Sequence, residues 1–306
     1  MLYPALAIFV GALTAIQSRL NGQLSKEIHN GIAAALISFG TGWIVLLILC
    51  FGIKNERIGL HNIWKAVQSG RLRKWEIIGG MGGGFFVATQ SITVPKLGVA
   101  IFTIATVGGQ TVASLLVDKF GISPAGKKQI TVPRIFAAIM TLFAVTIAVY
   151  PDLSNATISI FAIALTLVVG VVISFQQAIN GRVNVVATRP LATAFLNFVM
   201  GSVVLVVALT INLSNGGGIG HLPSSPWLYI GGPIGVIFIS VSAFTVKQMG
   251  ILNFVLTSVT GQLIGALLLD WLAPAANTSV SSYLVTGVLM TIAAILLGRY
   301  FESRKR

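Results

Sequence analysis

Two pairs of amide side chains are the residues in this sequence best suited to do chemistry. Gln17 and Asn21 lie four residues apart, and Gln176 and Asn180 repeat the same spacing. Residues four apart share one face of a helix, so each pair would present two amides side by side. An amide donates and accepts hydrogen bonds but does not titrate. The pairs therefore suit hydrogen bonding to an uncharged or weakly charged group.

Both pairs belong to longer blocks that occur twice. The pattern G-x5-Q-x3-N-G begins at Gly11 and again at Gly170, and the pattern G-Q-x7-D begins at Gly109 and again at Gly261. The two halves of the chain are therefore copies of one unit. The second block adds two further amides and two carboxylates, which are Gln110, Gln262, Asp118 and Asp270.

Two interpretations of these amides remain open. A buried amide without a partner costs about 1–3 kcal/mol, so the amide faces should point into the protein. They either flank a central cavity and bind a solute, or they bond to neighbouring helices and hold them together. The candidate solute-binding residues are Gln17, Asn21, Gln110, Gln176, Asn180 and Gln262.

The two repeated aspartates also have two possible roles. A carboxylate inside a membrane would be a candidate for coupling transport to protons. However, Asp118 and Asp270 fall at the ends of apolar segments, where a carboxylate can pair with a base or cap backbone amides. Arg19 could extend to the outer interface or face a cavity and bind an anionic group. The other carboxylates beside the predicted spans, Glu76, Asp152 and Glu302, lie at outer ends of the spans.

The composition excludes a soluble protein. Hydrophobic residues make up 55% of the chain and charged residues only 9%, whereas soluble domains carry about 25% charged residues. The net charge of +13 comes from basic residues in loops, which indicates membrane orientation and not nucleic-acid binding. The single cysteine, Cys50, excludes an internal disulfide. No P-loop, catalytic triad or metal-ligand spacing is present, so we expect neither an enzyme nor a metal or cofactor.

Ten apolar segments are long enough to span a bilayer, which needs roughly 20 residues per helix. They are residues 2–24, 32–52, 77–95, 97–118, 133–151, 158–183, 190–211, 226–247, 250–273 and 280–300. The connections between the third and fourth segments and between the eighth and ninth are very short, which predicts tight hairpins. The predicted fold is therefore an all-α membrane protein.

The basic residues predict how these helices cross the membrane. With the N-terminus in the cytoplasm, all but three of the 20 Lys and Arg residues fall on the cytoplasmic side, the exceptions being Arg19, Lys26 and Lys96. Both termini would then be cytoplasmic. Five helices per half is an odd number, so the halves, residues 1–152 and 153–306, would form an inverted repeat. In the basic loop at 53–76, apolar residues recur at helical spacing, which fits either a short interfacial helix or a solvated loop.

The repeated blocks, on ten helices in two halves, resemble the YdcZ-like, EamA-related branch of the drug/metabolite transporter superfamily. The matching residues are Gly11, Gln17, Asn21, Gly22, Gly109, Gln110 and Asp118, and then Gly170, Gln176, Asn180, Gly181, Gly261, Gln262 and Asp270. The resemblance implies a multi-pass protein of the bacterial inner membrane that works as an exporter, in the form where two halves are fused.

One departure from related proteins bears on the solute. The small multidrug resistance proteins use a glutamate in their first helix to couple protons to cationic drugs, whereas here Gln17 and Gln176 occupy the comparable stretches. This difference favours a neutral, zwitterionic or weakly anionic solute.

We therefore expect a secondary transporter that moves a small metabolite or drug-like solute by alternating access. Its expected partners are membrane lipid and the solute, and not nucleic acid, and the chain would act as a monomer or a homodimer. The alternatives are a membrane-embedded scaffold or accessory protein and a lipid-type flippase.

Overall fold

A computed structural model describes residues 2–303 apart from 123, 125, 128, 155–158, 250 and 275–279, and all regular structure in these residues is helical. The long helices are α1 (Leu2–Glu27), α2 (Gly31–Gly52), α5 (Met81–Phe120), α6 (Val132–Ser154), α7 (Ile160–Ala187), α8 (Pro190–Ser214), α9 (Gly231–Met249), α10 (Ile251–Leu272) and α11 (Ser282–Ser303). The short ones are α3 (Lys54–Gln68), α4 (Lys74–Ile77), η1 (Ile78–Gly80) and η2 (Pro226–Tyr229).

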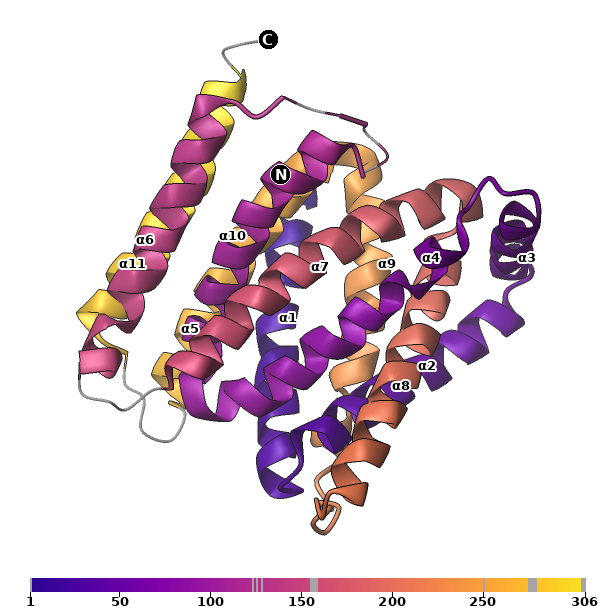
Figure 1. Ribbon diagram of the computed structural model, residues 1–306, viewed down its shortest axis with the longest axis horizontal. Helices are drawn as coiled ribbons and strands as arrows, with labels where there is room; N and C mark the ends of the chain where they lie inside the picture. Colours follow the sequence, from indigo (N-terminus) through magenta and orange to yellow (C-terminus); the bar gives the residue numbers. More distant parts are fainter. Residues whose placement is uncertain are drawn as a thin grey trace.

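A single glycine divides α5 into two helices. Gly98 has φ 78° and ψ 166°, a conformation that a residue with a Cβ rarely adopts. The chain turns back on itself there, which forms the hairpin predicted between residues 77–95 and 97–118 (Figure 1). The second predicted hairpin falls at Gly250, which lies outside the described residues.

The bundle has the dimensions and surface of a membrane protein. Seven described stretches are long and apolar enough to cross a bilayer, among them Lys74–Phe120, which contains the turn at Gly98. Ser282–Gly298 is a shorter apolar helix. Large apolar side chains such as Ile48 and Leu289 are exposed, as lipid contact requires.

The two halves of the chain pack closely against each other. The helix α1 packs most extensively on α10, and α7 on α5, so the first helix of each half lies along the other half's G-Q-x7-D helix. The helix α2 packs on α8, while α6 and α11 pair at one side of the bundle (Figure 1). The site described below therefore lies where the halves meet.

Glycines of the repeated blocks make these crossings possible. A Cβ on Gly11 would overlap the carbonyl oxygen of Ser258 in α10, and a Cβ on Gly170 would overlap that of Thr106 in α5. Small residues let membrane helices approach this closely. The repeated glycines are therefore required where helices of opposite halves cross.

The basic loop at 53–76 contains a helix. Its residues Lys54–Gln68 form α3, which buries Ile63 and Ala66 in a cluster with Val183 and Ala187 of α7. Trp64 remains 63% exposed. The helical interpretation of this loop is therefore confirmed, although its buried face contacts the protein.

Candidate functional site

A cavity of about 250 Å³ lies between the two halves. It is lined by five of the six predicted amides, namely Gln17, Gln110, Gln176, Asn180 and Gln262. None of the lining residues that the structure describes is charged. Among the residues that the structure describes, no group of His, Cys, Asp and Glu is placed to hold a metal ion. The described lining residues are suited to hydrogen bonding with a solute.

The repeated glutamines Gln17 and Gln176 bond to the protein in similar ways. Gln17 Nε2 donates to the carbonyl oxygen of Gly231 (2.8 Å), and Gln176 Nε2 donates to Asn197 Oδ1 (2.9 Å). Oε1 of Gln176 is buried and has no hydrogen-bond partner among the described residues. The side-chain nitrogen of each glutamine is thus bonded to the protein, and the side-chain oxygen can accept a hydrogen bond from a solute.

The backbones of Gln110 and Gln262 lie close against glycines of the opposite half. A Cβ on Gly170 would lie 3.0 Å from the backbone nitrogen of Gln110, and a Cβ on Gly11 would lie 2.8 Å from that of Gln262. The side chains of both glutamines line the cavity, and no hydrogen bond to them is found within the described part of the chain. Each therefore presents a complete amide to the cavity.

Asn21 does not line the cavity, unlike its repeat partner Asn180. It is fully buried, and its Nδ2 donates to Gln90 Oε1 (2.7 Å), while Gln90 Nε2 donates to Ser18 Oγ (2.6 Å). These bonds tie α1 to α5. Of the two interpretations left open for the amides, helix-to-helix bonding describes the environment of Asn21.

Several lining residues did not emerge from the repeated blocks. Gln90 and Asn197 are amides in otherwise apolar predicted segments, and this contrast is the signal that could have identified them. The apolar part of the wall includes Phe39, Phe86, Phe198 and Phe238. The rings of Phe39 and Phe198 lie 4.8 Å apart. Phenylalanine in a membrane segment carries no comparable signal, because lipid-facing positions also favour it.

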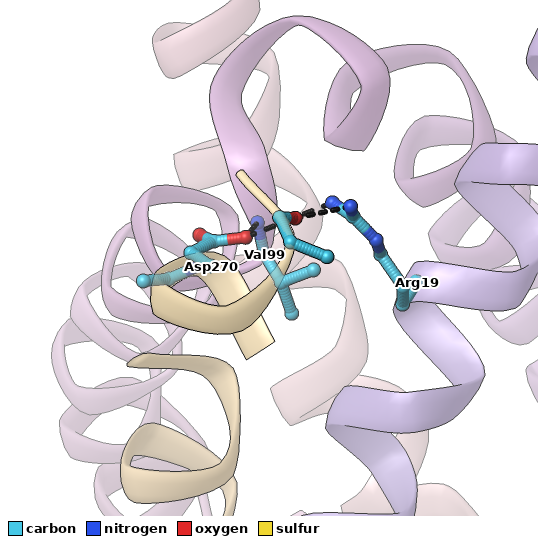
Figure 2. Close-up of polar contacts among 5 residues, drawn as sticks. Arg19, Val99 and Asp270 are labelled. Carbon is cyan, nitrogen blue, oxygen red and sulfur yellow. Dashed lines mark hydrogen bonds and ion pairs between the residues drawn. The ribbon is translucent and has the colours of Figure 1, made fainter. Parts of the chain in front are cut away.

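Asp270 caps a helix of the opposite half. Its carboxylate accepts hydrogen bonds from the backbone nitrogens of Val99 (3.0 Å) and Ala100 (2.6 Å), directly after the turn at Gly98. Figure 2 shows Arg19 approaching this carboxylate from α1, with Nη1 3.9 Å from Oδ1. Arg19 also donates to the carbonyl oxygen of Ala273. Arg19 is therefore directed at α10.

Asp118, the repeat partner of Asp270, has a different environment. Its Oδ2 lies 2.5 Å from Nη2 of Arg134, a residue of its own half. Both side chains are mostly buried, at 16% and 15% exposed. Each of the two aspartates thus has a base nearby, but only Asp270 joins the halves.

A buried ion pair at Glu76 was missed by the sequence analysis. Glu76 is 1% exposed, its Oε1 lies 2.5 Å from Nε of Arg182, and its Oε2 accepts a hydrogen bond from the backbone nitrogen of Arg73 (2.6 Å). Its position at the outer end of an apolar segment set it apart from the repeated aspartates. The helices α7 and α8 of the other half pack against α4 and cover it.

Comparison with known proteins places the chain in a family. The model of the family described as "Putative inner membrane exporter, YdcZ" matches residues 2–147 and again residues 161–297. The chain belongs to this family. Because the two matches fall on its two halves, it is a YdcZ-family protein of two repeated halves, in the inner membrane, with several membrane-spanning helices.

Solved structures support the fold of this YdcZ-family chain. A crystal structure at 15% sequence identity aligns over 100% of this chain and 98% of the other, with a TM-score of 0.61. At this identity the likeness shows the fold alone. A search of curated proteins gave no match.

Proposed function

We propose that this chain exports a small solute across the inner membrane by alternating access between its two halves. The observation that carries the proposal is the convergence of five repeated-block amides, from both halves, on one uncharged cavity. Inverted-repeat transporters hold their substrate at such an interface. Both halves of one chain contribute amides to the cavity, so the proposed mechanism does not require a second copy.

The proposal includes the membrane topology expected from the sequence. Counting Lys74–Phe120 as two spans divided at Gly98, and adding α9 and α11, gives ten. Successive long helices run in alternating directions (Figure 1). Two inverted five-helix halves, residues 1–152 and 153–306, with both termini in the cytoplasm, would account for these directions and for the distribution of basic residues.

Two ion pairs supply contacts that alternating access would break in turn. Glu76 with Arg182, and Arg19 with Asp270, each join one half to the other. Glu76 lies at the end of the basic loop that the proposed topology places in the cytoplasm. Arg19 lies in the C-terminal part of α1, which the same topology places toward the outer side. In the proposed mechanism, each pair opens when the cavity opens on its side.

Cysteine labelling tests the proposal, because Cys50 is the only cysteine. In a Cys50→Ala background, Ile173→Cys in α7 and Ile239→Cys in α9 place thiols in the cavity wall. We expect a membrane-impermeant maleimide to label both positions from either side of the membrane. Val168→Cys, 52% exposed on the outside of α7, is the control and should stay unlabelled.

Other labelling patterns would contradict the proposal. Labelling from one side alone, under every solute condition, would indicate a static vestibule. The absence of labelling, together with amide substitutions that change only the stability of the protein, would favour the scaffold.

One observation favours lipid flipping as a second candidate. An apolar groove of about 410 Å³ runs between α7 and the chain from Trp75 to Gly82, and Gln176 lines both the groove and the cavity. A Cβ on Gly82 would lie 3.1 Å from Val172 Cγ1 across the groove. If lipid uses this route, Gly82→Leu should abolish dithionite quenching of inner-leaflet fluorescent lipid in proteoliposomes. Equal quenching in protein-free liposomes would remove this candidate.

A further inference from the structure

No described residue of the cavity wall offers a counter-ion for a charged solute. The lining residues that the structure describes are uncharged, and the two carboxylates that join the halves already have partners. Glu76 pairs with Arg182, and Asp270 accepts two backbone hydrogen bonds beside Arg19. A solute charge would therefore be desolvated without compensation, which is unfavourable in a low-dielectric site.

The cavity presents hydrogen-bond acceptors whose direction the protein fixes. The nitrogen of Gln17 must face Gly231, because a carbonyl oxygen can only accept, and this leaves Gln17 Oε1 without a partner in the described chain. Oε1 of Gln176 is likewise unpartnered, and this side chain is only 6% exposed. Thr106 Oγ1 is also buried and unpartnered. Buried polar atoms normally have partners, so these positions indicate a ligand that donates hydrogen bonds.

Two complete amides add donors beside these acceptors. Gln110 and Gln262 each offer an oxygen and an NH₂ group in one plane, with no side-chain hydrogen bond inside the described protein. Such an amide forms two parallel bonds with a solute edge that carries a donor next to an acceptor. Gln and Asn bind the edges of nucleobases in this way.

Four phenylalanines form much of the apolar wall, together with Val87, Ile173 and Ile239. Phe39 and Phe198 form one tilted pair, and Phe86 and Phe238 line the cavity with them. Aromatic side chains bind the flat faces of unstacked bases. A polyol could use the amides, but it has no planar edge to engage them bidentately.

We infer that the solute is an uncharged nucleobase or nucleoside, and this inference rests on the proposed transport function. The amides of Gln110 and Gln262 pair with the edge of the base, the oxygens of Gln17 and Gln176 accept its remaining N–H or hydroxyl groups, and the phenylalanines contact its faces.

Binding to the purified full chain in detergent tests the inference. The probes are adenosine, uridine, adenosine monophosphate, mannitol, leucine and tetraphenylphosphonium, each followed by calorimetry and by the shift in melting temperature. We expect adenosine or uridine to bind, and the monophosphate to bind at least about tenfold more weakly because its charge lacks a partner. Gln110→Leu and Gln262→Leu should each weaken nucleoside binding by about tenfold. The matched control is Gln23→Leu, an exposed amide of α1 outside the cavity, which should leave binding unchanged.

The outcomes separate this inference from the transport proposal. If the monophosphate, mannitol, leucine or the phosphonium ion binds most tightly, and the Gln110 and Gln262 variants lose that binding, the solute class is wrong while the transport proposal stands. If no probe binds, the nucleobase inference is overturned. In that case cysteine labelling from both sides would still support transport, and its absence would remove both proposals.

Discussion

Oε1 of Glu76 lies 2.5 Å from Nε of Arg182, and these two residues belong to different halves of the chain. The carboxylate is almost fully buried, whereas the Arg182 side chain is 37% exposed. The same carboxylate also accepts the backbone N–H of Arg73 at the start of α4. One side chain thus holds a helix start and an interface between the halves.

Removing this charge should destabilise the protein. We expect Glu76→Gln to lower the free energy of unfolding by about 1–3 kcal/mol, less than for a fully buried pair, because solvent partly screens the exposed Arg182. Unfolding in mixed micelles measures the change. The double variant Glu76→Gln/Arg182→Gln should recover part of the loss. Strictly additive effects would show that the pair contributes no coupling.

The two repeated aspartates should differ in their contributions to stability. Asp270→Ala leaves two buried backbone donors at the helix start near Val99 without acceptors, whereas Asp118→Ala removes one mostly buried ion pair with Arg134. We expect Asp270→Ala to be more destabilising, by about 1–2 kcal/mol. Melting temperatures of the two variants, purified side by side, test this difference. An equal loss would mean that the cap at Val99 contributes little.

Glycine substitutions should separate close crossings from open positions. Gly170→Ala places a Cβ against the backbone of α5, so we expect a loss of at least about 1–3 kcal/mol or failure to fold. Gly40→Ala in α2 meets no atom within 4 Å and should be neutral or stabilising by up to about 1 kcal/mol. The yield and melting temperature of both variants provide the measurement. Equal tolerance of the two changes would argue against a tight crossing at Gly170.

Asn21 and Gln262 should separate structural amides from binding amides. Asn21→Ala leaves Gln90 Oε1 buried without its donor and should cost about 1–3 kcal/mol of stability. Gln262→Leu breaks no side-chain hydrogen bond of the described chain and should leave stability nearly unchanged. For solute binding we expect the reverse: Gln262→Leu should weaken binding, and Asn21→Ala should leave it nearly unchanged. A variant pair that loses both properties equally would contradict this division.

The sequence predicted those parts of the fold that local pattern determines. Apolar segments and the repeated G-x5-Q-x3-N-G block predicted the long helices, and helical spacing placed Gln17 and Gln176 toward the protein interior. The short link before residue 97 predicted the hairpin at Gly98. These predictions hold because the bilayer leaves few alternatives to a helix and because lipid offers no partner to an amide.

Features that depend on contacts between distant segments could not be predicted from the sequence. Asn21 and Asn180 are equivalent in the repeat, yet only Asn180 lines the cavity. The Asn21 side chain instead donates a hydrogen bond to Gln90. Asp118 and Asp270 likewise share a motif but not an environment. Glu76 was missed because the helices that bury it are distant in sequence. A repeat fixes which residues are equivalent, but the partners of each copy depend on the packed structure.

The cap that Asp270 places on the helix after Gly98 also bears on biogenesis. Asp270 follows its partner Ala100 by 170 residues, so the ribosome makes the helix long before it makes the residue that completes its start. After the first half inserts into the bilayer, the backbone N–H groups of Val99 and Ala100 lack their acceptor until the second half inserts. Synthesis order therefore makes the first half a dependent folding partner, and the halves expressed as separate polypeptides should accumulate only when both are produced in the same cell.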